Sequence, residues 1–241
     1  INGTSGYEEA AAQGLVAGAN AYLYLQKCDF LILKRQESYI GVMIDDLITS
    51  YLDEPYRMFT SRAEHRLFLR SDNCYSRLFS LAKKNNLLTP YQKNCCEALL
   101  GSEKTILRWV ETNSLVVGEK TIKHSQYLKR PEVAISDFVP KEILSLPFSK
   151  EACFNVETNI KYEGYIVNEL ERIKTVQKLE NLKIPRGFNY NKIQGLSNES
   201  RTRLMKVLPE TLGQASRISG IRPTDIALLG INISKYVSRE T

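Results

Sequence analysis

The feature that most constrains the fold of this chain is a spacing of apolar residues at every third or fourth position, which is typical of one face of an α-helix. It is clearest between Tyr39 and Leu52, and Pro55 follows soon after, where a helix is expected to have ended. After Leu52 the sequence shows neither the alternating strands and helices of a βαβ fold nor the short, evenly spaced strands of a β-sandwich. We therefore expect a mainly α-helical chain.

Cap residues and prolines predict where further helices begin and end. Thr89 followed by Pro90 predicts the start of a helix that runs to about Val110, and the polar turn at the amino end leads into a helix that continues to about Tyr24. The remaining expectations are a helix capped by Ser71 or Asp72, one long charged helix over 157–179, short helices and loops over 111–146, and several short helices over 185–241. The stretch 66–70 is predicted as either a short strand or an extended piece bounded by turns. The side chains expected to face the core in the two middle helices are Tyr75, Leu78, Phe79, Ala82, Tyr91, Cys95, Ala98, Leu99, Ile106, Trp109 and Val110.

Composition places the chain among globular proteins. Its 241 residues are enough for one large or two modest hydrophobic cores, and 43% hydrophobic against 25% charged residues is ordinary for such a protein. No apolar run approaches the roughly 20 residues needed to cross a bilayer, so we expect no membrane association. No signal-peptide pattern is present, and because the first residue is Ile1 we expect a fragment of a larger protein.

The five cysteines are expected to be small apolar side chains on helices, in a reducing, cytoplasmic compartment. They form no Cys-x-x-Cys pair, and only His65 and His124 could add imidazole ligands, so we expect no metal site. Each histidine is surrounded by charged residues, which makes a nucleophile–base pair improbable, and we assign no catalytic residue. Asp45 and Asp46 point about 100° apart on a helix and are expected to cap it, to pair with an arginine or to face solvent.

The net charge of +6 is concentrated in two blocks. Residues 57–84 hold seven basic and two acidic residues, a net charge of +5, and residues 186–241 hold nine basic and four acidic residues, again a net charge of +5. The rest of the chain is therefore acidic overall. Two basic blocks separated by an acidic scaffold suit a polyanion that is contacted at two places.

The densest functional signal lies in residues 54–70. Four arginines alternate there with aromatic residues: Arg57, Arg62, Arg66 and Arg70 with Tyr56, Phe59 and Phe68. Arginines bind phosphates, while aromatic rings and guanidinium planes stack on bases that are splayed out of an RNA loop. The alternative is a solvated basic face on which Glu64 pairs locally.

Three weaker signals remain. The small residues Ala10, Gly14, Ala17, Gly18 and Ala21 leave one helix face almost without side chains, which permits close approach of another element or a ligand. The turn before this helix offers free amides that can stabilise an anionic group. Residues 193–200 and 218–225 repeat an Ile-x-Gly-apolar turn that leads into a capped helix beside an arginine, Arg201 or Arg222. This repeat is either a phosphate cradle or ordinary helix punctuation.

Five motifs can be compared with known families. They are residues 1–14 (INGTSGYEEAAAQG), 54–67 (EPYRMFTSRAEHRL), 161–166 (KYEGYI), 195–199 (GLSNE) and 213–220 (GQASRISG). In this order they closely resemble the MnmG family, also called GidA, and they span nearly the whole chain. The first motif alone would also fit the related folate-dependent tRNA methyltransferases, but the other four would not.

The resemblance implies an FAD-dependent enzyme that works with the GTPase MnmE. It implies that (carboxymethyl)aminomethyl groups are added to C5 of the wobble uridine of tRNA, with NADH and methylenetetrahydrofolate as further reactants, by a cytoplasmic homodimer. The chain would be the helical carboxy-terminal region after a short remnant of an FAD-binding α/β domain. Residues 1–52 would end that domain and carry linking helices, 53–183 would form a helical tRNA-binding body, and 184–241 a terminal helical subdomain.

The resemblance also implies roles for particular residues. Asn2, Gly3, Thr4 and Tyr7 would lie near the flavin. Arg57 and Arg66 match arginines that the family uses for tRNA, and we extend this role to Arg62 and Arg70. Gln214, Arg217 and Gly220 belong to the motif expected to contact the GTPase. The chain lacks the glycine-rich dinucleotide fingerprint and the family's catalytic cysteines, so the fragment alone would be inactive, with FAD bound mostly by missing sequence. The alternative is a protein-interaction module that docks the GTPase while RNA is bound elsewhere.

Overall fold

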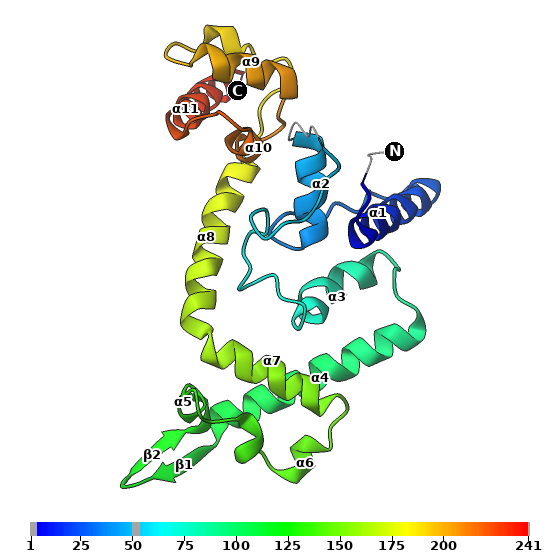
Figure 1. Ribbon diagram of the computed structural model, residues 1–241, viewed down its shortest axis with the longest axis vertical. Helices are drawn as coiled ribbons and strands as arrows, with labels where there is room; N and C mark the ends of the chain where they lie inside the picture. Colours follow the sequence, from blue (N-terminus) through cyan, green and yellow to red (C-terminus); the bar gives the residue numbers. More distant parts are fainter. Residues whose placement is uncertain (1–3, 50–53, 241) are drawn as a thin grey trace. The chain divides into compact units, whose positions relative to one another are not determined.

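The computed structural model describes residues 4–49 and 54–240 of the chain. Helices make up most of the described residues, and the strands among them form one short antiparallel hairpin (Figure 1). This confirms the prediction of a mainly α-helical fold. The chain divides into two compact units: the first unit comprises residues 1–17, 32–64 and 170–241, and the second unit comprises residues 18–31 and 65–169.

The elements of the amino-terminal half are α1 (Tyr7–Leu25), α2 (Tyr39–Thr49), α3 (Cys74–Lys84), α4 (Pro90–Thr112), β1 (Ser114–Val117) and β2 (Lys120–Lys123). Those of the carboxy-terminal half are α5 (His124–Tyr127), η1 (Ile135–Asp137), α6 (Lys141–Leu144), α7 (Ser149–Lys161), α8 (Glu163–Asn181), η2 (Tyr190–Lys192), α9 (Asn198–Val207), α10 (Leu212–Arg217) and α11 (Pro223–Glu240). Helices α1 and α8 each contribute residues to both units.

The second unit is organised around the pair of helices α4 and α7, which lie side by side (Figure 1). The amino end of α4 has the predicted cap: the Thr89 hydroxyl accepts the backbone N–H of Gln92, and the Gln92 side chain accepts the N–H of Thr89. Ile106 and Val110 of α4 are fully buried, and they pack in one cluster with Val156 and Ile160 of α7. Burying each such side chain contributes roughly 1.5–3 kcal/mol.

A separate hydrophobic cluster forms the core of the carboxy-terminal part of the first unit. Leu204 of α9 and Leu229 of α11 are fully buried in it, together with Ala215 of α10. The two repeated turns belong to this cluster, and Gly195 and Gly220 both have φ of +83°, a conformation that favours glycine. The first turn leads into α9 and the second into α11, as predicted.

Three predicted elements differ from the observed ones. The long helix expected over 157–179 is two helices, because α7 ends at Lys161, Tyr162 leaves the helical conformation with φ of −100° and ψ of 11°, and α8 begins at Glu163. The break takes only one residue, so it leaves the apolar spacing almost unchanged. The last helix, α11, has 18 residues and is not short. The stretch 66–70 is neither a strand nor extended: the backbone N–H groups of Phe68 and Leu69 both donate to the carbonyl of His65 and close a turn.

The hairpin is the element that the prediction of short helices and loops over 111–146 missed. Val117 pairs with Lys120 across a two-residue loop, and Gly118 in this loop has φ of +62°. Three errors concern the ends and faces of helices. Asn73, not Ser71 or Asp72, precedes α3, and it makes no side-chain cap bond. Tyr75 and Tyr91, expected to face the core, are 51% and 77% exposed.

The small-residue face of α1 does not make the expected close contact with any described residue. A Cβ atom added at Gly14 or Gly18 would meet no described atom within 4 Å, and Ala10, Ala17 and Ala21 are exposed. The cost of glycine in a helix interior, about 1 kcal/mol relative to alanine, is therefore not offset by packing within the described residues.

The described residues contain no disulfide bond and no cluster of metal-binding side chains. All five cysteines are free, with Cys96 and Cys153 buried and Cys28 exposed, so the apolar role expected of them fits the first two better than the third. Within ranges 4–49 and 54–240, no group of three or more histidine, cysteine or acidic side chains could hold a metal ion. No helix in the same ranges is long and apolar enough to cross a membrane.

Candidate nucleic-acid interface

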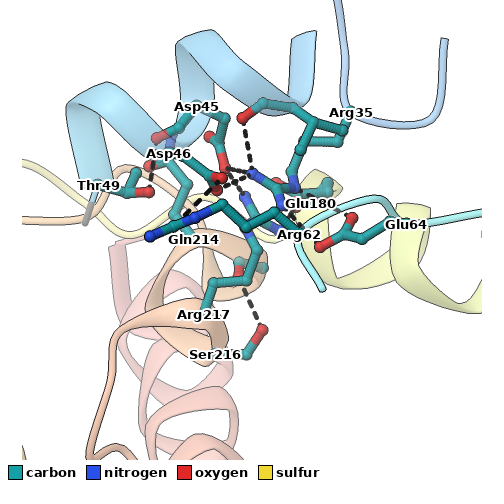
Figure 2. A network of polar contacts seen from close by, with 12 residues as sticks. Arg35, Asp45, Asp46, Thr49, Arg62, Glu64, Glu180, Gln214, Ser216 and Arg217 are labelled. Carbon is teal, nitrogen blue, oxygen red and sulfur yellow. Dashed lines mark hydrogen bonds and ion pairs between the residues drawn. The ribbon is translucent and has the colours of Figure 1, made fainter. Parts of the chain in front are cut away.

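The arginine-rich segment lies in irregular backbone after α2, and a buried ion-pair network holds its first part. Arg35 is at the centre of this network, which Figure 2 shows. One of its terminal nitrogens donates to Asp46 at 2.6 Å, to Asp45 at 3.0 Å and to the carbonyl of Val42 at 3.1 Å. Its remaining N–H groups donate to both carboxylate oxygens of Glu64, at 2.6 and 3.1 Å.

The Arg35 side chain is only 7% exposed, so its charge depends on these partners. Burial by itself lowers the pKa of the guanidinium group, but the hydrogen bonds that Arg35 donates to Glu64 and Asp46 outweigh it and the pKa is raised. A buried arginine with its acceptors in place is stable, whereas removing one partner leaves an uncompensated charge. Asp45 and Asp46 thus pair with an arginine, one of the three roles expected for them.

Asp46 connects this network to the arginine-rich segment. Its second carboxylate oxygen accepts the hydroxyl of Tyr56 at 2.9 Å and lies 3.8 Å from a terminal nitrogen of Arg62. Tyr56 is 2% exposed, and its pKa is raised, first by burial and then by its hydrogen bond to Asp46. The Arg62 guanidinium lies 5.2 Å from the centre of the Tyr56 ring. Arg62 is therefore held on one side, with about a third of its side chain exposed.

Asp45 connects the same network to helix α10. Its carboxylate lies 2.8 Å from a terminal nitrogen of Arg217, whose other terminal nitrogen bonds to Glu180 of α8. Glu180 also accepts the hydroxyl of Thr211 at 2.9 Å. A Cβ atom at Gly213 would lie 2.4 Å from the Glu180 carboxylate, so only glycine lets Glu180 lie so close to α10.

The four candidate arginines differ in how much of each guanidinium is free. The side chain of Arg57 is 50% exposed, and its nearest acid, Glu9, is 3.9 Å away. The pKa of Glu9 is lowered, chiefly because its carboxylate accepts the backbone N–H of Met58. Arg66 is exposed and makes no hydrogen bond or ion pair with any residue that the structure describes. Arg57 and Arg66 thus have the most guanidinium surface available to a ligand.

The guanidinium group of Arg70 is hydrogen-bonded to residues of its own unit. Its guanidinium donates three hydrogen bonds to Asp72, at 3.0 to 3.1 Å, one to the carbonyl of Leu67 and one to the side chain of Asn159. The side chain is 15% exposed. Arg70 therefore orders the turn that precedes α3, and of the four it has the fewest donors left for RNA.

The residues expected to meet a partner are partly used inside the first unit. Arg217 belongs to the ion-pair network, and the Gln214 side chain accepts the backbone N–H of Glu210 at 2.7 Å. Gly220 is exposed, and a Cβ atom there would meet the guanidinium of Arg203 at 2.7 Å. The motif therefore shapes the subdomain as well as offering a surface.

The arginines beside the repeated turns are also used internally. Arg201 donates to the carbonyls of Ile193 and Leu196, at 3.4 and 3.3 Å, and Arg222 pairs with Asp225 of α11 at 3.1 Å. These contacts favour ordinary helix punctuation over a phosphate cradle.

Of the four residues assigned to the flavin, Asn2 and Gly3 lie outside the described residues. The hydroxyl of Thr4 accepts a hydrogen bond from the Gln13 side chain at 2.8 Å, and Tyr7 is 90% exposed. A hollow of about 340 Å³ is lined by acidic and apolar side chains, among them Glu8, Glu9 and Met43, and this lining offers no basic group to a cofactor phosphate. The described residues here fit at most an edge of a flavin cofactor.

Sequence reasoning missed Arg35 and Glu180, which hold the network together. Arg35 forms its ion pair with Glu64 across 29 positions, and Arg217 forms its ion pair with Glu180 across 37. Apolar spacing carries no information on such pairs. A signal was present only for Asp45 and Asp46, as two adjacent acids on an otherwise apolar helix.

These contacts define a mainly helical module with an arginine-rich surface segment. The segment's exposed arginines lie in a chain region that also contains buried ion pairs. Neither histidine hydrogen-bonds a described serine, threonine or cysteine side chain: His65 bonds to Glu169, and His124 packs against Trp109.

Three family models match the chain. "Glucose inhibited division protein A" matches residues 1–29, "tRNA modifying enzyme MnmG/GidA C-terminal helical domain" residues 98–170, and "tRNA modifying enzyme MnmG/GidA C-terminal helical bundle" residues 172–241. Together they match well over half of the chain, which belongs to the MnmG/GidA family.

Individual relatives agree with the family. A protein of Treponema denticola named tRNA uridine 5-carboxymethylaminomethyl modification enzyme MnmG is 46% identical over 96% of this chain and 40% of its own length. The protein of the same name from Chlorobium luteolum is 42% identical over 98% of this chain and 41% of its own length. The crystal structure of Aquifex aeolicus GidA matches with a TM-score of 0.78 at 40% identity, over 96% of this chain and 39% of that chain. This chain thus spans about two fifths of the length of the relatives it matches.

Proposed function

We propose that this chain is the tRNA-contacting and partner-contacting portion of an enzyme that modifies the wobble uridine of tRNA. The observation that carries the proposal is the exposed guanidinium surface of Arg57 and Arg66, in a chain whose relatives are named tRNA uridine modification enzymes. Both residues lie in the basic block of residues 57–84. Exposed arginines bind phosphate through bidentate hydrogen bonds, and they position an RNA without reading its sequence.

Arg62 is included in the proposal, with a more restricted role. Its guanidinium is packed on Tyr56 and lies near Asp46, so one edge remains available to a phosphate. Arg70 would act indirectly, by ordering the turn next to Arg66 through its bonds to Asp72.

The proposed whole protein follows the MnmG family. FAD, with NADH and methylenetetrahydrofolate, would supply the one-carbon and redox chemistry, and the GTPase MnmE would be the partner of a cytoplasmic homodimer. Thr4 and Tyr7 would touch only the edge of the flavin, because Tyr7 is 90% exposed and the hollow lined by Glu8 and Glu9 has a volume of only about 340 Å³. The described residues would therefore bind and orient the RNA, and they would not carry out the reaction.

The test of RNA binding uses filter binding of the chain to an unmodified tRNA transcript over a series of salt concentrations. We expect the logarithm of the association constant to fall linearly with the logarithm of salt concentration, because phosphate contacts release counterions. Replacing Arg57 and Arg66 together by alanine should reduce the slope by roughly 2, about 1 per lost phosphate contact. Arg108→Ala, an exposed arginine of α4, is the matched control and should change the slope little. Binding that is absent, or an unchanged slope in the double variant, would contradict the proposal.

A second surface supports the partner-docking part of the proposal. Apolar side chains of α8, α10 and α11 line an open hollow of about 630 Å³ in the first unit, where Leu182 is 41% and Ile231 is 53% exposed. Exposed apolar patches of this kind mark protein interfaces more often than RNA sites. We propose that this hollow, beside the motif that carries Gln214 and Gly220, docks the GTPase.

The docking test measures the affinity of the chain for the purified GTPase by calorimetry. Ile231→Asp should weaken binding at least tenfold, because it places a charge in an apolar contact, while tRNA affinity stays unchanged. Lys235→Ala, at the rim of the same hollow, is the control and should have a small effect. Equal affinity of Ile231→Asp and the native chain would remove this surface from the proposal.

A further inference from the structure

Two tyrosines are exposed at the corner between α7 and α8, and neither belongs to a hydrophobic core cluster. Tyr162 lies at the break between the helices, and Tyr165 is in the first turn of α8 (Figure 1). They are 47% and 65% exposed, with ring centres 6.4 Å apart and ring planes tilted by 50°. Aromatic side chains exposed together on a surface indicate a contact with a ligand or partner.

Basic and acidic side chains form pairs at this corner. An open hollow of about 670 Å³ beside Tyr165 is lined by Lys129, Lys161 and Asn168, among others. Lys129 pairs with Glu163 at 2.6 Å, and Lys161 donates to Glu157 at 2.8 Å and to the carbonyl next to Arg130, that of Pro131, at 3.3 Å. Lys129 and Lys161 are therefore each paired with an acid, and Arg130 lies beside Lys129 in a stretch that also holds Glu132.

The same face of α8 also anchors Arg66. The ring of His65 lies 2.6 Å from the carboxylate of Glu169, which is four residues after Tyr165 in the same helix. Residues four apart lie one above the other on a helix face, about 6 Å apart along the axis. His65 has φ of +50°, an uncommon conformation outside glycine, and the contact with Glu169 stabilises it. The residue before Arg66 is therefore fixed to α8 at Glu169, one helical turn after Tyr165.

We propose that Tyr165 is a stacking platform for an unpaired RNA base, in a strand whose phosphate is bound by Arg66. An exposed aromatic face lies on the helix that fixes the residue before the partner-free Arg66, and the two together match the contacts that single-stranded RNA offers, a base plane and a phosphate. Tyr162 forms the second side of the platform, and Lys129, Arg130 and Lys161 attract the backbone. Arg66, which is exposed and has no partner among the described residues, favours RNA over an apolar protein surface as the occupant. This inference rests on the proposed RNA-binding function and adds the class of nucleotide, an unpaired one.

The experiment uses the 241-residue chain and two hairpin RNAs. One has a single-stranded loop, and the other has the same stem and backbone with abasic loop nucleotides. Tyr165→Ala should weaken binding to the first RNA about tenfold, because one stacked base is lost, and should leave the salt slope unchanged. Tyr165→Phe, which keeps the ring, should bind like the native chain. Tyr91→Ala is the matched control, since Tyr91 is 77% exposed on α4 of the same unit.

The abasic hairpin separates stacking from other causes. Native chain and Tyr165→Ala should bind it equally, because there is no base to stack. If Tyr165→Ala binds the looped RNA as tightly as the native chain, or loses affinity equally for both RNAs, the stacking inference is overturned. Suppose that Tyr165→Ala leaves RNA affinity unchanged, while replacing Arg57 and Arg66 reduces the salt slope. This result would overturn the stacking inference alone. An unchanged slope in that double variant would overturn the RNA-binding function itself.

Discussion

Asp225 shows how one buried acid can join two helices of the terminal subdomain. Asp225 is only 1% exposed, and its carboxylate accepts a hydrogen bond from the Ser200 hydroxyl of α9 at 2.6 Å. The guanidinium of Arg222 donates to both of its oxygens, at 3.1 and 3.2 Å. Ser200 and Asp225 occupy the same place in the first turns of α9 and α11, so the repeated sequence motif becomes a direct contact between its two copies.

These contacts predict a pH dependence of stability. The hydrogen bond from Arg222, with that from Ser200, lowers the pKa of Asp225 to about 2, from an ordinary value of 3.8. A carboxylate whose pKa is lowered in the folded state stabilises it above the ordinary pKa, and this stabilisation is lost as the pH falls through the folded pKa. We expect Asp225→Asn to have a lower free energy of unfolding than the native chain at about pH 5, and the difference to shrink steadily from about pH 4 to pH 2.

Urea unfolding at a series of pH values measures this difference. Asparagine can still accept from Ser200, so the variant isolates the charge. Other carboxylates titrate in the same range, but they do so in both proteins and cancel in the comparison. A difference that stays constant between about pH 5 and pH 2 would contradict the proposed role of the charge.

At the level of helices and strands, local sequence signals predicted the elements that depend on local contacts. The cap at Thr89 and the proline after it fixed the start of α4 because both act within one helical turn. The turns at Gly195 and Gly220 were also predictable, since a positive φ leaves glycine as the favoured residue. The mainly helical fold followed from the same apolar spacing.

Elements that depend on distant partners were not predictable in this way. The break at Tyr162 preserves helical spacing on both sides, so no pattern could distinguish two helices from one. Tyr91 lies at a position that helical spacing assigns to the core, but it is in the first turn of α4 and is 77% exposed. The hairpin over 114–123 was read as loop because each strand has only four residues.

The candidate site shows the same division. Residues 54–70 were recognisable as basic and aromatic, but the sequence could not separate the committed Arg70 from the partner-free Arg66. That difference arises from Asp72 and Asn159, and Asn159 is 89 positions away. Arg35 had no signal at all, because an isolated arginine in a polar turn gives no sign of burial.

At the scale of the whole molecule, the chain has two hydrophobic cores. Ile106 belongs to the cluster of the second unit and Leu204 to that of the first, and both side chains are 0% exposed. The two clusters share no residue. Cooperative unfolding depends on buried contacts that are lost together, so separate cores favour separate transitions.

We therefore predict two transitions in scanning calorimetry of the chain. Ile106→Ala and Leu204→Ala each remove a buried aliphatic side chain and should cost about 2–5 kcal/mol of their own unit's stability. Each variant should lower one transition temperature and leave the other in place, so that the two transitions can be assigned to the two units. The exposed neighbours Leu107 and Met205 supply matched controls, and their alanine variants should shift neither transition by much, because 38% and 49% of their surface is already in water. A single transition that both core variants lower equally would show that the units unfold as one and would contradict this prediction.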